Sequence, residues 1–196
     1  MIAMMFVIMF VLFLLTVPVS TALGLSSIIT AIGINLPVGL ITQRFFGGLN
    51  SFTLLAIPFF ILAGSLMETT GISRRIVDFV GTMVGHFHGG LATVMIVACM
   101  FFGALSGSAA ATVAAIGSIM IPSMVKKGYD LRFSAATQAA AAGLAVIIPP
   151  SISMILYCVG TNVSISDLFV AGFIPGILLG LTEIIYAWYK TSYKKI

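Results

Sequence analysis

Charged residues are scarce in this sequence. Of its 196 residues, 7% are charged and 60% are hydrophobic, and the mean hydropathy is +1.22. Soluble domains carry about 25% charged residues, so a surface that faces water cannot be built from this chain. The composition excludes an ordinary soluble domain and predicts an all-α integral membrane protein.

Cysteine, histidine and clustered basic residues are also few. Cys99 and Cys158 are the only cysteines and lie in apolar runs, which excludes a disulfide framework and indicates two small buried apolar side chains. His86 and His88 are two residues apart and leave a helix on different faces, so we interpret them as polar residues near the membrane surface and not as ligands. The nine basic residues are spread over short loops, which argues against nucleic-acid binding.

Apolar runs predict the membrane spans. A bilayer core takes about 20 apolar residues per helix, and such runs occupy residues 2–18, 22–42, 51–68 and 168 to about 189. The first run lacks the positive region of a signal peptide, so we expect a retained span. The second is weakened at Asn35-Leu36-Pro37, and we expect Pro58 to kink the third. The tail that follows the last span is basic.

The segment from residue 71 to 88 differs from these spans. Arg74, Arg75 and Asp78 alternate there with apolar residues such as Val77, which is typical of an amphipathic helix lying in the membrane interface.

The distribution of basic residues tests this map. If the first residue lies on the outer side of the membrane, Arg44 is the one basic residue that falls on that side. An excess of basic residues on the other side is what the positive-inside rule expects for cytoplasmic loops. The arrangement requires residues 89–125 to begin and end on the same side. The basic residues that fall inside are Arg74, Arg75, Lys126, Lys127, Arg132, Lys190, Lys194 and Lys195.

The uncharged tract 89–125 is too long for one span. A helix of this length would reach roughly 55 Å, against a hydrocarbon core of about 30 Å. The chain must therefore turn back, and Ser106-Gly107-Ser108 is the natural place. Two complete spans and a shorter hairpin that turns inside the membrane both fit; the absence of charged, Trp or Tyr anchors near the turn favours the hairpin. A plain packing face of small residues is the alternative, formed by Gly103, Gly107, Ala111 and Ala115.

A second interruption occurs at Pro149-Pro150 inside the apolar run 133–160. Each proline lacks an N–H group, which leaves the carbonyls of Ala145 and Val146 without their helical donors. Such carbonyls need a partner inside lipid. With the hydroxyls of Ser151 and Ser153 they would suit Na⁺, and the free N–H groups of the next half-helix would suit a carboxylate. A hinge without a ligand is the alternative.

The sequence FFGALSGSAAATVAAIGSIMIPSMVKKGYD, followed by AAAAGLAVIIPPSISMILYCVGTNVSISDLFVAGFIPGILLG, closely resembles the large membrane subunit of tripartite ATP-independent periplasmic (TRAP) transporters. The resemblance implies an elevator-type secondary transporter of the bacterial inner membrane. Such proteins use a sodium gradient to import organic acids such as C4-dicarboxylates, sialic acid or keto acids. They receive the substrate from a periplasmic binding protein and work with a small four-helix membrane subunit.

The resemblance also implies a domain plan. Residues 1–70 would be scaffold helices and 71–88 an interfacial arm. Residues 89–166 would form half of a transport domain, made of a re-entrant hairpin at 89–126 and a discontinuous helix at 132–160, and 167–196 the last helix and basic tail. Sodium would bind between the hairpin tip and the broken helix, with Ser106, Ser108, Val146 and Ser151 as candidate ligands. The wider predicted site comprises Ser106, Gly107, Ser108, Ala145, Val146, Pro149, Ser151 and Ser153.

The family's large subunit has two inverted halves, and this chain contains each motif once, so it resembles the first half only. The second half would be a partner. Other functions that we weigh are an ion channel, a structural subunit of a membrane complex, and an intramembrane serine protease. The last rests on Ala104-Leu105-Ser106-Gly107, which is distantly similar to the GxSG of rhomboid proteases, with His86 or His88 as base. The sequence leaves the substrate open, and also whether Glu183 faces a partner helix or lipid.

Overall fold

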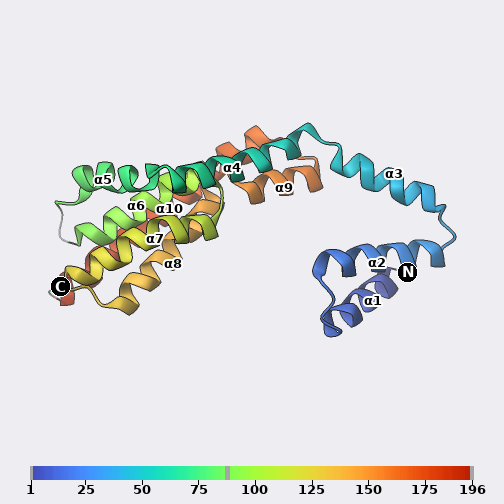
Figure 1. The fold of residues 1–196 in the computed structure, drawn as a ribbon, viewed down its shortest axis with the longest axis horizontal. Coiled ribbons are helices and arrows are strands. Elements are labelled where there is room, and N and C mark those ends of the chain that lie inside the picture. Colours follow the sequence, from blue (N-terminus) through green and yellow to red (C-terminus); the bar gives the residue numbers. More distant parts are fainter. Residues whose placement is uncertain (1, 87–88, 195–196) are drawn as a thin grey trace. The chain divides into compact units, whose positions relative to one another are not determined.

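The structure, a computed structural model, describes residues 2–86 and 89–194, and every regular element within them is helical. This confirms the all-α prediction; His88 and Lys195 lie outside the described residues. Contacts group the helices into two units, residues 1–51 and 52–196. The elements are α1 (Ile2–Leu14), α2 (Val19–Gly33), α3 (Val38–Leu49), the 3₁₀ segment η1 (Phe52–Leu55), α4 (Ala56–Thr69), α5 (Ile72–Val84), α6 (Gly90–Ser106), α7 (Ala109–Lys126), α8 (Leu131–Ile147), α9 (Ile152–Thr161) and α10 (Ile165–Lys194) (Figure 1).

In the first unit, α1 packs against α2, and α2 contacts α3. The buried residues of α2 include Ala22, Ser26 and Thr30, which are spaced four apart along one face. The hydroxyls of Ser26 and Thr30 donate to the carbonyls of Leu23 and Ser26, at 3.1 and 2.7 Å. These polar groups are thus satisfied within their own helix, as burial requires.

The weak point predicted at Asn35-Leu36-Pro37 is a full break, so residues 22–42 do not form one continuous helix. The chain leaves the helix after Gly33, where Asn35 adopts a positive φ of 54°, and helix resumes only after Pro37. A proline disfavours helical geometry in the residue before it, here Leu36. The predicted first span is also shorter than expected, because α1 ends at Leu14 and Thr16 has a φ of 59°.

The second unit is built around α6, which packs against α5, α7, α8 and α10. The largest fully buried side chains of α6 are Met95, Ile96 and Phe102. Helices α6 and α7 form an antiparallel hairpin, and α8 lies against both of its arms (Figure 1). Pro58, which we expected to kink a span, lies in the first turn of α4, directly after the 3₁₀ segment.

Helix α10 contacts this bundle through glycines spaced four apart. A Cβ atom on Gly176 would lie 2.6 Å from Cγ1 of Ile148, and one on Gly180 would lie 2.6 Å from Sδ of Met100. A Cβ on Gly172 would lie 3.2 Å from Cγ of Pro149. Small residues at this spacing let membrane helices approach closely. Here they bring α10 into close contact with the interrupted helix and, at Gly180, with α6.

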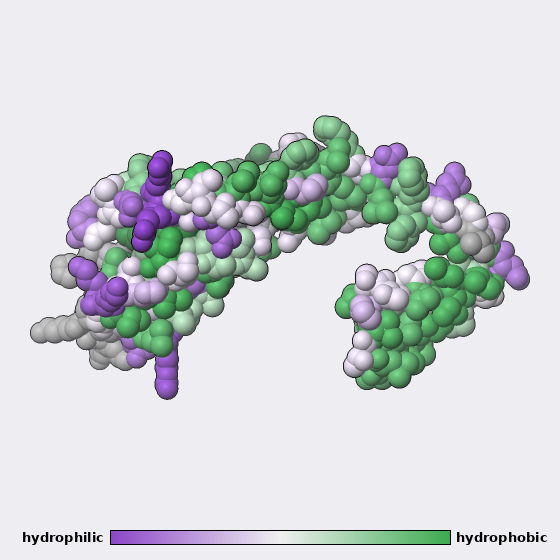
Figure 2. Space-filling view, in the orientation of Figure 1, coloured by the Kyte–Doolittle hydropathy of each residue, from purple (hydrophilic) through white to green (hydrophobic). Residues whose placement is uncertain are grey.

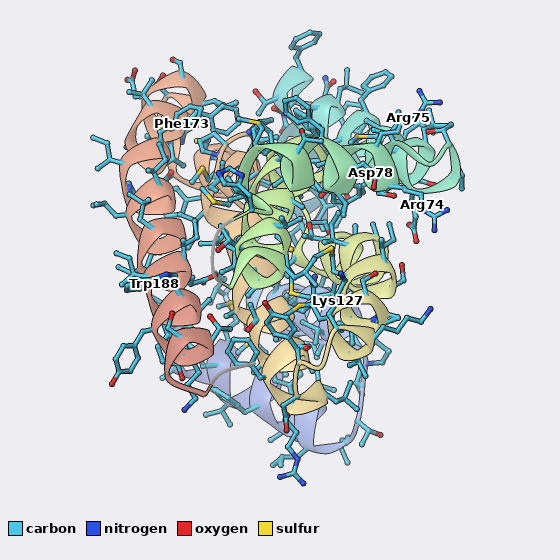
Figure 3. The ribbon with its side chains drawn as sticks, turned by 90° about the vertical axis from the view of Figure 1, so that its left-hand side faces the viewer. Arg74, Arg75, Asp78, Lys127, Phe173 and Trp188 are labelled. Atoms are coloured by element: carbon cyan, nitrogen blue, oxygen red, sulfur yellow. The ribbon has the colours of Figure 1, made fainter. Side chains whose placement is uncertain are left out.

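Four helical segments are long and apolar enough to cross a membrane, at residues 52–69, 109–126, 131–161 and 165–192. Their outward faces are apolar: Phe59 is 67% exposed and Ile174 70%. Figure 2 shows these surfaces as extended green areas. In Figure 3, Phe173 and Trp188 lie along α10. The structure therefore describes a multi-pass integral membrane protein.

Helix α5 is amphipathic, as the sequence indicates. Ser73, Val77 and Val80 are buried, whereas Arg74 and Arg75 are exposed. Figure 3 shows both arginines projecting from α5 away from the bundle. Its position in the membrane interface remains a prediction.

Three basic residues of the second unit, Lys127, Arg132 and Lys190, lie near one end of the bundle. Gly89, at the start of α6, lies against the last turns of α10, where its Cβ would be 3.6 Å from Cα of Trp188. Tyr129, between α7 and α8, hydrogen-bonds the main chain of Leu91. Lys127 and Arg132 lie close to Tyr129 in the sequence and Lys190 lies close to Trp188, so these three basic residues share this end of the bundle.

Candidate functional site

The hairpin turns at Ser106-Gly107-Ser108. Helix α6 ends at Ser106, and Gly107 follows in the left-handed region with φ of 62°, its N–H donating to the carbonyl of Gly103 at 2.7 Å. Glycine takes this conformation at a helix end without steric cost. Ser108 is extended and caps α7, its Oγ accepting from the N–H of Ala111 at 3.4 Å. Only two residues therefore separate the end of one helix from the start of the next.

The second interruption opens the helix over residues 148–151. Helix α8 ends at Ile147, and Ile148 is extended although its N–H still donates to the carbonyl of Leu144 at 2.8 Å. Pro149 and Pro150 have no N–H to offer the carbonyls of Ala145 and Val146. Helix α9 then begins at Ile152 without a side-chain cap. A second pair of helix ends thus carries unpaired main-chain groups.

The hairpin tip lies in this gap. A Cβ on Gly107 would be 3.1 Å from the nitrogen of Ile152 and 3.3 Å from the carbonyl oxygen of Pro150. One turn earlier, a Cβ on Gly103 would be 2.5 Å from the Cβ of Ala145 and 2.6 Å from its Cα. The two breaks are therefore in main-chain contact, and four helix ends meet. The ends of α6 and α8 carry partial negative charge, and the starts of α7 and α9 partial positive charge.

Buried hydroxyls surround the tip. Ser106 is 1% exposed, and its Oγ accepts from the N–H of Ser108 at 3.4 Å. The Oγ1 of Thr112 is 3.4 Å from the Oγ of Ser106, and it donates to the carbonyl of Ser108 at 2.8 Å. Thr112 is fully buried. The sequence analysis missed it, although a hydroxyl residue four positions after Ser108 shares its helix face.

Ser151 carries an unsatisfied side-chain oxygen at the site. Its side chain is fully buried, and its Oγ has no hydrogen-bond partner within residues 2–86 and 89–194. Buried polar atoms in native proteins nearly always have a partner, and leaving one unpaired costs about 1–3 kcal/mol. Because Ser151 lies next to Ile152 and the hairpin tip, its unpaired oxygen makes this junction a candidate site for a ligand.

Gln138 joins both arms of the hairpin to α8. The Nε2 of this buried residue donates to the carbonyl of Thr112 at 3.3 Å and lies 3.5 Å from Sγ of Cys99. A Cβ on Gly117 would be 3.2 Å from Cγ of Gln138. Cys99 and Cys158 are both buried, as predicted. Gln138 thus fixes both arms of the hairpin against α8, and on α7 it does so through Thr112, which also contacts the tip.

The structure brings most predicted site residues to one place. Ser106, Gly107, Ala145, Pro149 and Ser151 lie at the junction of the two breaks, and all except Gly107 carry buried side chains. Ser108 and Val146 are half-buried at its margin, whereas Ser153 is exposed on α9. Among the described residues, no cluster of three His, Cys, Asp or Glu side chains exists. The available ligands are hydroxyl and carbonyl oxygens, which suit a hard cation.

The geometry is not that of a serine protease. His86 precedes the start of α6, and Ser106 ends it, so the length of a helix of about 25 Å separates them. A general base must approach its nucleophile to about 3 Å. His88 lies outside the described residues.

Comparison with known proteins shows the family of this chain. The family model for the DctM component of tripartite ATP-independent periplasmic transporters matches residues 6–196, and the chain belongs to this family of transporters, which are not enzymes. It is 44% identical to the C4-dicarboxylate TRAP transporter large permease protein DctM of Vibrio cholerae, over 100% of this chain and 44% of that protein.

Two further relatives carry other substrates in their names. The isethionate TRAP transporter permease protein DctMQ of Oleidesulfovibrio alaskensis is 46% identical over 92% of this chain and 29% of that protein. The 2,3-diketo-L-gulonate TRAP transporter large permease protein YiaN of Escherichia coli is 43% identical over 79% of this chain and 36% of that protein. The chain thus spans less than half the length of these relatives.

Proposed function

We propose that this chain forms the first inverted-repeat half of the large membrane subunit of a sodium-coupled importer of organic acids. The observation that carries the proposal is the buried, unpaired Oγ of Ser151 at the meeting point of two helix breaks. Hydroxyls of Ser106 and Ser108 and carbonyls of Ala145 and Val146 supply further oxygen ligands. When bound, Na⁺ would occupy this junction and satisfy oxygens that otherwise have no partner in lipid.

An organic acid fits the opposite polarity of the same junction. The starts of α7 and α9 direct main-chain N–H groups toward it, and such groups bind anions. The substrates named in the relatives are C4-dicarboxylate, isethionate and diketo-gulonate, all of them anions at neutral pH. Broken helices that hold substrate and coupling ion side by side are typical of secondary transporters. Because one half carries one pair of breaks, the complete substrate site needs the second half.

The remaining parts of the proposal follow from the family. The partners would be the second half of the large subunit, a small four-helix membrane subunit and a periplasmic binding protein that delivers the acid, all at a bacterial inner membrane. Residues 1–70 would act as scaffold. The two arms of the hairpin and α8 share extensive contacts, which supports their moving together in an elevator mechanism, with α5 as the connecting arm.

An uptake assay on the intact assembly tests this function. Proteoliposomes that hold the complete permease should accumulate a radiolabelled carboxylate from a panel only when an inward sodium gradient and the binding protein are both present. A potassium gradient of equal size is the control. Uptake that persists without sodium would contradict sodium coupling, and ion current without uptake would indicate a channel. A structural subunit predicts neither signal.

The depth of the hairpin in the membrane calls for a separate experiment. The tip meets the helix break at residues 148–151, and α9 continues for 10 residues beyond it, which supports a turn inside the membrane. In a permease without native cysteines, a cysteine at the exposed Leu105 should therefore react with an impermeant thiol reagent at least about tenfold more slowly than one at the exposed Asn162 beyond α9. Equal rates for the two positions would instead favour two complete spans.

A further inference from the structure

A groove separate from the helix breaks is formed by α6, α8 and α10. It measures about 450 Å³, and its lining includes Ile96, Phe133, Thr137, Glu183 and Tyr186. Phe133 and Thr137 belong to the first two turns of α8, whereas the candidate ion site lies at the other end of that helix. Gly180 holds α10 against Met100 and Leu144 one turn before Glu183, and Glu183 lines this groove as a half-buried residue.

Glu183 has an unpaired oxygen in this groove. Its Oε2 is buried and has no hydrogen-bond partner among the described residues. No Lys, Arg or His belongs to the described lining. An ionisable residue within a membrane span normally faces protein and is paired, and α10 is one of the segments long enough to span. The carboxylate therefore lacks the partner that its position demands.

The other groups of the groove define that partner. The hydroxyls of Thr137 and Thr182 donate to carbonyls of their own helices, at 2.9 Å to Phe133 and 2.7 Å to Leu179. Both hydroxyls have thus used their protons and offer only lone pairs. The rings of Phe133 and Tyr186 add aromatic groups, which attract cations. The Tyr186 hydroxyl can also donate, but the remaining polar groups of the lining are acceptors without a positive charge, and together with the aromatic rings they favour a cation that carries N–H donors.

We propose that a lysine or arginine side chain, carried by a transmembrane helix from the remaining part of the permease, enters this groove and pairs with Glu183. The relatives are more than twice as long as the segment that this chain matches, so further membrane helices are available. The pair would be a docking contact between parts of the permease, distinct from the proposed transport site.

The test uses the intact permease with its partner chains in phosphatidylcholine vesicles. Glu183→Gln keeps the shape of the side chain but removes its charge, and it should lower the recovery of intact permease after mild heating about tenfold, since breaking a buried pair is strongly destabilising. Asp167→Asn is the matched control, because Asp167 is an exposed acid on the same helix. Recovery of the Glu183→Gln variant equal to that of this control would overturn the proposal.

Charge exchange then identifies the partner. Each Lys or Arg in the spans of the remaining part is replaced by methionine, and one replacement should reproduce the loss seen with Glu183→Gln. Exchanging the two charges, with Glu183→Lys and the partner residue changed to glutamate, should restore recovery. Failure of every replacement to reproduce the loss would overturn the proposal. So would a loss that appears only in vesicles containing phosphatidylethanolamine, which would assign the groove to a lipid ammonium group.

Discussion

Replacing Ser151 with alanine is expected to raise the sodium concentration for half-maximal uptake by the intact permease about tenfold, which corresponds to the loss of about 1.4 kcal/mol of ion binding. The reason is that Oγ of Ser151 is buried without a partner beside the hairpin tip. If it is a sodium ligand, the alanine variant loses one oxygen of the coordination shell. The measurement is uptake as a function of sodium concentration.

The same substitution separates this role from a merely structural one. If no ion visits the site, removing an unsatisfied buried hydroxyl should stabilise the protein, because the cost of burying that hydroxyl disappears. Ser153→Ala is the control, because Ser153 lies two residues after Ser151 and its side chain is exposed. An unchanged sodium dependence together with a higher thermal midpoint for Ser151→Ala would remove Ser151 from the site.

The second large effect is expected at Gly103. A methyl group there would lie 2.5 Å from the Cβ of Ala145 and 2.6 Å from its Cα, so Gly103→Ala must push α6 away from α8. Overpacking of this kind typically costs about 1–3 kcal/mol, and here the contact is with main chain, which cannot rotate aside. We expect a clearly lower thermal midpoint for the purified permease, and loss of uptake because the hairpin tip leaves the gap.

Gly143 provides the matched control for this prediction. It lies on α8 near Ala145, and a Cβ there would meet nothing within 4 Å. Alanine has a higher helix propensity than glycine by about 1 kcal/mol, so Gly143→Ala should leave the permease as stable as before or more so. Equal behaviour of the two variants would show that close approach at Gly103 does not hold the hairpin in place.

The backbone interruptions could be predicted from sequence because their causes are local. Pro149 and Pro150 remove donors whatever surrounds them, and Ser106-Gly107-Ser108 combines a helix-ending glycine with a capping serine. The family resemblance then indicated that the two breaks belong to one site. The weak point predicted at Asn35-Leu36-Pro37 is local in the same way, because Pro37 disfavours helical geometry at Leu36, and the structure has a full break there between α2 and α3.

The contacts that complete the site depend on tertiary packing and were not predictable in the same way. Gln138 and Thr112 are 26 residues apart, and nothing in either local sequence indicates that they hydrogen-bond. The exposure of Ser153 is likewise decided by how α9 is rotated in the bundle. Glu183 could not be assigned to a protein-facing or lipid-facing side until the close approach of Gly180 to α6 fixed the rotation of α10.

The joint between the hairpin tip and the opened helix has a consequence for how the protein tolerates change. Since Gly107 meets Ile152 and Pro150 through main-chain atoms, the width of the gap is set by the polypeptide itself. Exchange of one apolar side chain for another on the outer faces of α8 or α9 leaves those atoms where they are. Membrane-facing positions are therefore free to adapt to different lipids while the geometry of the junction between the breaks stays the same.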